Sequence, residues 1–203
     1  MNRLTEKAQE ALASAQASAV QSGHQRVDVE HLLAALLEDP EGIALSLISA
    51  VGIPPENLKR RLNQELERLP KVSSELGEPS EVYATSRLGK VLAQAEAEAK
   101  SFKDDYVSIE HLLLAMIGDS GPTGRLLKEF GLTKDRLLEF IKKIRGNQRV
   151  TSPNPEGTYQ ALEKYGRDLT RDAASGKRVR RQFEAIIPRR AQETRLARRY
   201  FVW

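Results

Sequence analysis

The chain carries one segment twice. Residues 27–37 read VDVEHLLAALL, and residues 107–117, which lie 80 positions later, read VSIEHLLLAMI. The match continues before this segment at the same offset, where Thr5 meets Thr85, and after it at an offset of 79, where Gly52 meets Gly131. A tandem duplication constrains the fold before any single motif is considered, because both units must adopt one plan. Each unit spans roughly 65–70 residues, which is enough for four helices joined by short connections.

The apolar residues of each unit recur at helical spacing. In the first unit they predict a helix that ends near Gly23, a second after Asp28, a third between Gly42 and Gly52, and a fourth after Pro54. In the second unit the same signals predict helices over 86–103, 108–118, 123–130 and 133–145. No segment alternates convincingly in the way that a strand does. The predicted fold is all-α, with two tandem four-helix repeats in pseudo-twofold symmetry.

Composition sets the boundaries of the predicted domain. Repeat one covers about 1–70 and repeat two about 80–146, and together they form one domain over 1–146. The residues between the repeats are rich in Pro, Ser and Gly, as a join is. Pro, Gly and Asn are again concentrated in 147–158, which predicts a linker. With 40% apolar but only 5% aromatic residues, the core is expected to be aliphatic.

The basic charge of the chain is confined to its end. The chain has a net charge of +4, of which residues 177–203 carry +7 from nine Lys or Arg and two Glu, so residues 1–176 carry −3. The total is therefore no sign that the domain itself binds nucleic acid. The absence of cysteine excludes disulfides and thiolate chemistry. With no apolar run near the roughly 18 residues of a membrane span, the expected location is the cytoplasm.

No motif for catalysis is present in the sequence. The phosphate-binding pattern Gly-x-x-x-x-Gly-Lys-Ser/Thr is absent, because the spacing from Gly118 to Gly124 is wrong and Arg125 follows. The three histidines are His24, His31 and His111, and none has a partner ligand three or four residues away. They are expected to be packed or capping residues. We therefore expect no enzyme activity, no metal and no cofactor.

Several segments together resemble a known family. They are RLTEKA at 3–8, Gly23-His24 ahead of the doubled Val-x-x-Glu-His-Leu-Leu motif, RLPKV at 68–72 and TYQALEKYGRDLT at 158–170. The chain resembles the Clp N-terminal domain of the ClpB and ClpC ATP-driven unfoldases, and is closest to the ClpB branch. The resemblance implies an eight-helix module that a mobile linker joins to a hexameric AAA+ motor, which threads aggregated proteins through its pore.

The resemblance ends before that motor. Residues 159–177 are similar to the lead-in to the first AAA+ module, whereas the basic tail over 178–203 is expected to be helical or disordered and unrelated to the family. A truncated or frameshifted gene is the simplest account, and a genuine, differently evolved tail is the alternative. Val179, Phe183 and Ile186 lie at helical spacing on this basic background, so the tail could also bind nucleic acid or an anionic membrane surface.

The ClpB resemblance implies a site for clients. Thr5, Asp104 and Glu110 match positions that the family associates with substrate handling near one groove, and Leu92 matches its apolar lining. Gln94 and Glu98 stand where a strong apolar groove would have apolar residues. The alternatives are that Asp104 belongs to a solvated acidic turn and that Leu92 belongs to the core.

The ClpC resemblance implies a second chemistry. Thr5, Glu30, Thr85 and Glu110 match the threonines and glutamates with which ClpC-type domains grip a phosphorylated arginine. A carboxylate can pair with the guanidinium and a hydroxyl can donate to the phosphate. The alternative is that both threonines cap helices and both glutamates complement helix dipoles.

These inferences define the expected function. We expect a non-catalytic substrate-binding module of a ClpB-type protein disaggregase, and the second repeat is expected to bind if only one does. Its partners are expected to be unfolded or aggregated proteins and a full-length ClpB hexamer, with no membrane partner and no nucleic acid. A phosphoarginine-reading adaptor and a nucleic-acid binder that acts through its tail remain as alternatives.

Overall fold

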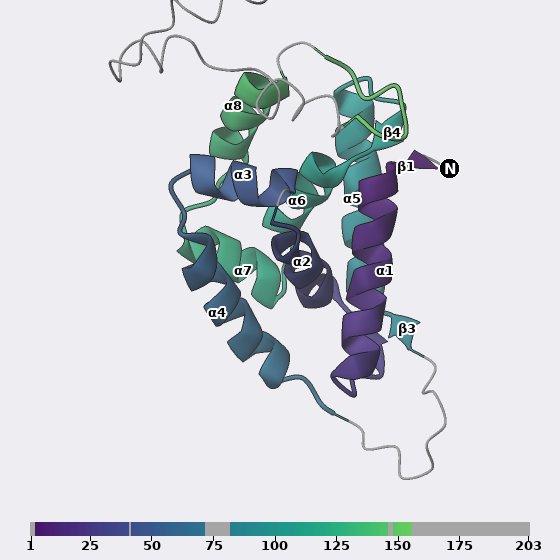
Figure 1. Ribbon diagram of the computed structural model, residues 1–203, viewed down its shortest axis with the longest axis vertical. Coiled ribbons are helices and arrows are strands. Elements are labelled where there is room, and N and C mark those ends of the chain that lie inside the picture. Colours follow the sequence, from purple (N-terminus) through teal and green to yellow (C-terminus); the bar gives the residue numbers. More distant parts are fainter. Residues whose placement is uncertain (1–2, 41, 72–81, 146–147, 156–203) are drawn as a thin grey trace, which may run out of the picture. The chain divides into compact units, whose positions relative to one another are not determined.

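The computed structural model describes residues 3–40, 42–71, 82–145 and 148–155 (Figure 1). The chain divides into two compact units, Met1–Tyr159 and Gln160–Trp203. All described residues belong to the first unit, which contains both repeats. The predicted lead-in over 159–177 and the basic tail over 178–203 lie outside the described residues.

Eight helices make up the described part of the two repeats. The first repeat contains α1 (Glu6–Gln21), α2 (Val29–Glu38), α3 (Ile43–Ala50) and α4 (Pro55–Glu67). The second contains α5 (Ser86–Ser101), α6 (Ile109–Ile117), α7 (Pro122–Glu129) and α8 (Lys134–Arg145). The prediction of an all-α fold with two four-helix repeats is confirmed. None of these helices combines the length and the apolar character that a membrane span requires.

The residues before the helices explain where the helices begin. Thr5 and Thr85 are the N-caps of α1 and α5, and each side chain accepts a hydrogen bond from a backbone N–H in the first turn. His31 and His111 occupy the third position of α2 and α6, where Nδ1 accepts the backbone N–H of the N-cap residue at 3.1 and 3.0 Å. The expectation that these two histidines cap helices is confirmed.

Within the described residues, four two-residue strands connect the repeats. They are β1 (Arg3–Leu4), β2 (Arg26–Val27), β3 (Tyr83–Ala84) and β4 (Tyr106–Val107). β1 pairs in parallel with β4, and β2 pairs in parallel with β3, so each pair joins one repeat to the other. The register sets Arg3 opposite Tyr106 and Arg26 opposite Tyr83. These strands carry no signal in the sequence, because two residues leave no alternation and their partners lie in the other repeat.

The duplicated segment forms the centre of the core. It supplies α2 and α6, in which nine of ten and all nine residues are buried (Figure 1). The core is aliphatic, as expected, and its fully buried large side chains in these two helices are Leu32, Leu33, Leu37, Leu112, Leu113 and Met116. Each contributes about 1.5–3 kcal/mol relative to an exposed position. The duplicated segment therefore identified the two helices on which the others pack.

A close approach at the start of α7 yields a stability prediction. A Cβ atom at Gly124 would lie 2.0 Å from the carbonyl oxygen of Asp119, so Gly124→Ala must displace backbone. We expect it to lower the free energy of unfolding by about 1–3 kcal/mol, although alanine favours helices. Gly89 in α5 is the matched control, because nothing lies within 4 Å of its added Cβ. Gly89→Ala should raise the free energy by about 0.5–1 kcal/mol. Chemical denaturation of both variants checks this, and an equal change in the two would contradict it.

Candidate functional site

One buried ion cluster surrounds Arg87 and joins the repeats. The Nε atom of Arg87 lies 3.0 Å from Asp28 Oδ1 and 3.7 Å from Asp119 Oδ1, and its terminal nitrogen pairs with Glu30. The hydroxyl of Thr123 donates to Glu30 Oε1 over 3.1 Å. Glu30 is only 1% exposed. Its buried carboxylate is paired with the cation that α5 supplies.

The electrostatics of this Arg87 cluster favour a permanent charge on the arginine. Burial alone lowers the pKa of Arg87, but Glu30, Asp28 and Asp119 outweigh it, and the pKa lies above its ordinary value. The hydroxyl of Thr85 donates to Asp28 Oδ1 over 2.7 Å. The structure thus brings the phosphoarginine candidates Thr85 and Glu30 into one cluster, but an arginine of the chain already occupies it.

A second buried ion cluster surrounds Arg145 at the end of α8. Arg145 pairs with Asp104 through one terminal nitrogen, and the other lies 3.6 Å from Glu110 Oε1. The Nε2 atom of His111 lies 3.1 Å from Asp104 Oδ2. The backbone N–H of Val150 donates to Asp104 Oδ1 over 2.9 Å. The client-binding candidates Asp104 and Glu110 are therefore neighbours, and both are buried.

The Arg145 cluster keeps Asp104 ionised. Burial alone raises the pKa of Asp104, but His111, Arg145 and the Val150 N–H outweigh it and hold the pKa below its ordinary value. Asp104 follows Lys103, whose φ of 59° turns the chain sharply after α5. Asp104 is thus a buried acceptor, and the alternative of a solvated acidic turn applies only to its exposed neighbour Asp105.

The first repeat has a histidine pair where the second has Asp104 and His111. His24 is the twin of Asp104, and His24 Nδ1 lies 2.8 Å from His31 Nε2. Because His31 Nδ1 accepts the N–H of Asp28, neutral His31 carries its proton on Nε2 and donates it to His24. Burial and the neighbouring His24 lower the pKa of His31 to about 4. This pair is therefore neutral near pH 7.

The remaining candidates lie on α1 and α5. Thr5 is fully buried, and its backbone N–H donates to the Val107 carbonyl over 2.9 Å, beside the start of α6. Leu92 is partly buried and packs against the hydrophobic core, to which Leu88 also belongs. Glu98 is buried and accepts Lys134 Nζ over 2.6 Å, so it links α5 to α8.

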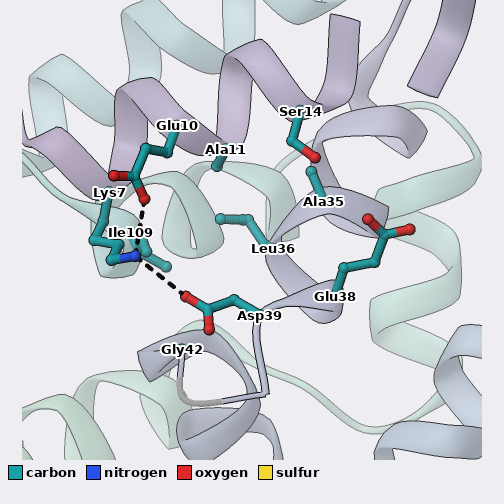
Figure 2. A pocket seen from close by; sticks show the side chains of 10 residues that line it. All are labelled: Lys7, Glu10, Ala11, Ser14, Ala35, Leu36, Glu38, Asp39, Gly42 and Ile109. Carbon is teal, nitrogen blue, oxygen red and sulfur yellow. Dashed lines mark hydrogen bonds and ion pairs between the residues drawn. The ribbon is translucent and has the colours of Figure 1, made fainter. Parts of the chain in front are cut away.

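An open cleft of about 310 Å³ lies between α1 and α2, with Ile109 at its end (Figure 2). Its apolar part consists of Ala11, Ala35, Leu36 and Ile109. Its polar part consists of Lys7, Glu10, Ser14, Glu38 and Asp39. Lys7 Nζ lies 2.8 Å from Glu10 and 3.8 Å from Asp39, across the mouth of the cleft. This combination suits weak contact with a peptide rather than catalysis, because apolar atoms adjoin charged groups that remain in water.

The sequence alone does not reveal the cations that organise both clusters. Arg87 and Arg145 were not singled out, because each meets its carboxylates only through tertiary packing. One available signal was that Arg87 and Asp119 stand 80 positions after Lys7 and Asp39, so that charge recurs at twin positions. In the described part of the chain, no group of three or more His, Cys, Asp or Glu side chains could hold a metal ion.

Comparison with known proteins assigns this arrangement to a family. Residues 3–130 match the family described as the Clp repeat (R) N-terminal domain. The chain is 44% identical over 177 residues to the chaperone protein ClpB of Bacillus cereus, covering 87% of this chain and 20% of that protein. It is 40% identical over 200 residues to ClpB of Nitratidesulfovibrio vulgaris, covering 98% and 22%. The chain thus spans about a fifth of the length of these curated relatives.

Solved structures agree with the family match. The Hsp104 N-terminal domain from Candida albicans has a TM-score of 0.65 and 25% identity, and the match covers 76% of this chain and 99% of that one. A ClpV N-domain in complex with a VipB peptide has a TM-score of 0.56 and 15% identity, covering 69% and 85%. The second likeness concerns the fold alone. The resemblance that the sequence indicated is confirmed.

The Arg87 cluster yields a second stability prediction. Arg87→Met removes the cation and leaves the buried carboxylates of Glu30 and Asp119 without it, so the free energy of unfolding should fall by about 3–5 kcal/mol. Lys59→Met is the control, because Lys59 pairs with an exposed Glu56 at 3.5 Å. That variant should change stability by no more than about 0.5 kcal/mol. Urea denaturation measures both, and similar losses in the two would refute a special role for Arg87.

The histidine pair predicts how stability depends on pH. The folded pKa of His31, about 4, lies below that of an unfolded histidine, so the unfolded state binds the proton first as pH falls. The contribution of neutral His31 to the free energy of unfolding is fully present above about pH 6.5. It is lost as the pH falls from about 6.5 to 4, and the loss is at most about 3 kcal/mol. His31→Asn retains an acceptor for the Asp28 N–H but does not titrate. Unfolding free energies over this range should therefore fall less steeply in the variant, whereas parallel curves would contradict the prediction.

Proposed function

This chain belongs to the Clp repeat N-terminal domain family, and we propose that it is the non-catalytic client-binding module of a ClpB-type protein disaggregase. Its clients are unfolded or aggregated proteins in the cytoplasm, and a full-length ClpB hexamer is its second partner. The chain corresponds to about a fifth of its curated relatives, so ATP-driven threading belongs to the rest of such a protein.

The observation that carries this proposal is the cleft between α1 and α2. Its floor includes Leu36 and Ile109, which are only 2% and 4% exposed, so a side chain of an unfolded client can meet a small apolar area there. Its charged rim keeps the contact shallow and reversible, because Glu10 and Glu38 remain in water. Weak binding suits a module that must release clients to a motor.

Leu92, Thr5, Asp104 and Glu110 have different parts in this proposal. Leu92 is partly exposed and contributes apolar contact on α5. Thr5, Asp104 and Glu110 are buried, so they support client binding from beneath the surface by positioning the backbone around them. Of the four client-binding candidates, Leu92 therefore touches the client, and the other three hold the surrounding backbone in place.

Phosphoarginine reading finds less support. The guanidinium of a ligand would have to displace Arg87 from Glu30 or Arg145 from Glu110, and both glutamates are buried. Thr5 and Thr85 also serve as N-caps. The alternative through the basic tail lies outside the described residues. We therefore retain client binding as the function of the described domain.

Substitutions on α1 test the cleft. Ser14 lies at its edge, and Ser14→Lys places a long side chain across the mouth beside Glu10 and Glu38. We expect its affinity for casein, a permanently unfolded protein, to fall about five- to tenfold, which is about 1–1.4 kcal/mol. Gln16→Lys is the matched control, because it adds the same charge at an exposed position of α1 outside the cleft.

Fluorescence anisotropy of labelled casein, titrated with the full chain and both variants, measures this. The proposal fails if the parent chain does not bind casein at all. The cleft is excluded as the contact site if both lysine variants lose affinity equally or neither loses any.

A further inference from the structure

The cleft between α1 and α2 has an acidic rim. Three carboxylates, those of Glu10, Glu38 and Asp39, and the single ammonium group of Lys7 line it, which gives a net formal charge of −2. Lys7 Nζ lies 2.8 Å from Glu10 and 3.8 Å from Asp39, so two acids share its charge (Figure 2). Glu38 forms no ion pair with any residue that the structure describes. The rim therefore attracts cations and repels anions.

The second repeat shows what fills the equivalent place there. Three residues of the cleft have twins in that repeat, which are Arg87 for Lys7, Asp119 for Asp39 and Gly121 for Gly42. Arg87 Nε lies 3.7 Å from Asp119 Oδ1, and a Cβ atom added at Gly121 would overlap the guanidinium of Arg87. A cationic side chain of the chain itself thus lies against the backbone at Gly121.

In the first repeat the same place is open. The side chain of Lys7 is 44% exposed and reaches across the mouth, whereas that of Arg87 is 24% exposed. The three heavy atoms nearest to a Cβ added at Gly42 all belong to Asp39, and no atom of Lys7 is among them. Lys7 therefore does not fill the space against Gly42, and a cleft of about 310 Å³ is left there.

Two of the rim acids belong to the first repeat alone. The twins of Glu10 and Glu38 are Lys90 and Gly118. Glu38 is exposed and is the last residue of α2, where the negative end of the helix dipole disfavours a carboxylate. Helix stability therefore does not explain the acid at this position, whereas attraction of a cation to the cleft does.

We propose that this cleft binds a cationic side chain of the client, an arginine or a lysine, and thereby selects basic segments of unfolded proteins. The inference rests on the proposed client-binding function and names the client chemistry. The cation lies against Gly42 beside Asp39, as Arg87 lies against Gly121 in the second repeat. Glu38 attracts it from the rim, and an apolar neighbour in the client meets the small apolar floor of the cleft.

Two peptides that differ in one charge test the proposal with the full chain. Both have blocked ends and the sequence GSAVXVASG, in which X is arginine or its uncharged isostere citrulline. NMR titration of the isotope-labelled chain measures both affinities. We expect the arginine peptide to bind about three- to tenfold more tightly, and this difference to shrink at high salt. The arginine peptide should also shift the amide signal of Gly42 but not that of Gly121, because Arg87 fills the twin place.

Charge variants locate the effect in the cleft. Glu38→Gln should weaken binding of the arginine peptide about two- to fivefold and leave the citrulline peptide unaffected. Lys7→Gln removes the competing ammonium group and should strengthen binding of the arginine peptide. Glu67→Gln is the matched control for Glu38→Gln, because it makes the same charge change at an exposed position of α4 outside the cleft, and it should alter neither affinity.

The outcomes separate this inference from the proposed function. Equal affinities for the two peptides, or equal effects of Glu38→Gln and Glu67→Gln, would overturn the inference. Binding of neither peptide by a chain that binds casein would overturn it as well and leave client binding in place. If the parent chain binds neither the peptides nor casein, the proposed function itself fails.

Discussion

The carboxylate of Glu30 lies inside the domain, and the fold can keep it there only because a cation arrives from the other repeat. An ionised carboxylate without a partner is expensive to bury. Arg87 meets it from α5, and Thr123 donates to it from α7. All sides of the central helix α2 can therefore be buried only when the second repeat is folded against it. The first repeat thus depends on the second for the partners of its buried carboxylate.

The repeats share a backbone plan but have divided the polar chemistry between them. Where the first repeat has the neutral pair His24 and His31, the second has the ionised Asp104 beside His111. In the neutral pair, His31 accepts the N–H of Asp28 at the start of its own helix. A buried carboxylate can also accept the N–H of a residue distant in sequence, as Asp104 does from Val150. Both repeats nevertheless seat the chain that follows their last helix at this position, because Lys71 pairs with His24 in the first repeat and Val150 bonds to Asp104 and Asp105 in the second.

The fold was largely predictable, whereas the chemistry of the candidate site was not. Helix spacing and the caps at Thr5 and Thr85 are local properties that a sequence displays directly. Glu30 was correctly placed at a helix start, but its burial depends on Arg87, which lies 57 residues away. The predicted linker contains Val150, whose burial follows from tertiary contacts rather than composition. Local sequence patterns reveal neither ion pairs between distant residues nor the packing of a segment that has no regular secondary structure.

The register of the short strands bears on how this duplication persists. The first repeat supplies an arginine to each strand pair and the second supplies a tyrosine. Two copies of the first repeat would set arginine against arginine, and two copies of the second would set tyrosine against tyrosine. Of these two pairings, only arginine opposite arginine is repulsive, because like charges directly across a strand pair destabilise it. The division of arginine and tyrosine between the repeats therefore favours pairing of the two different repeats over pairing of the first repeat with a copy of itself.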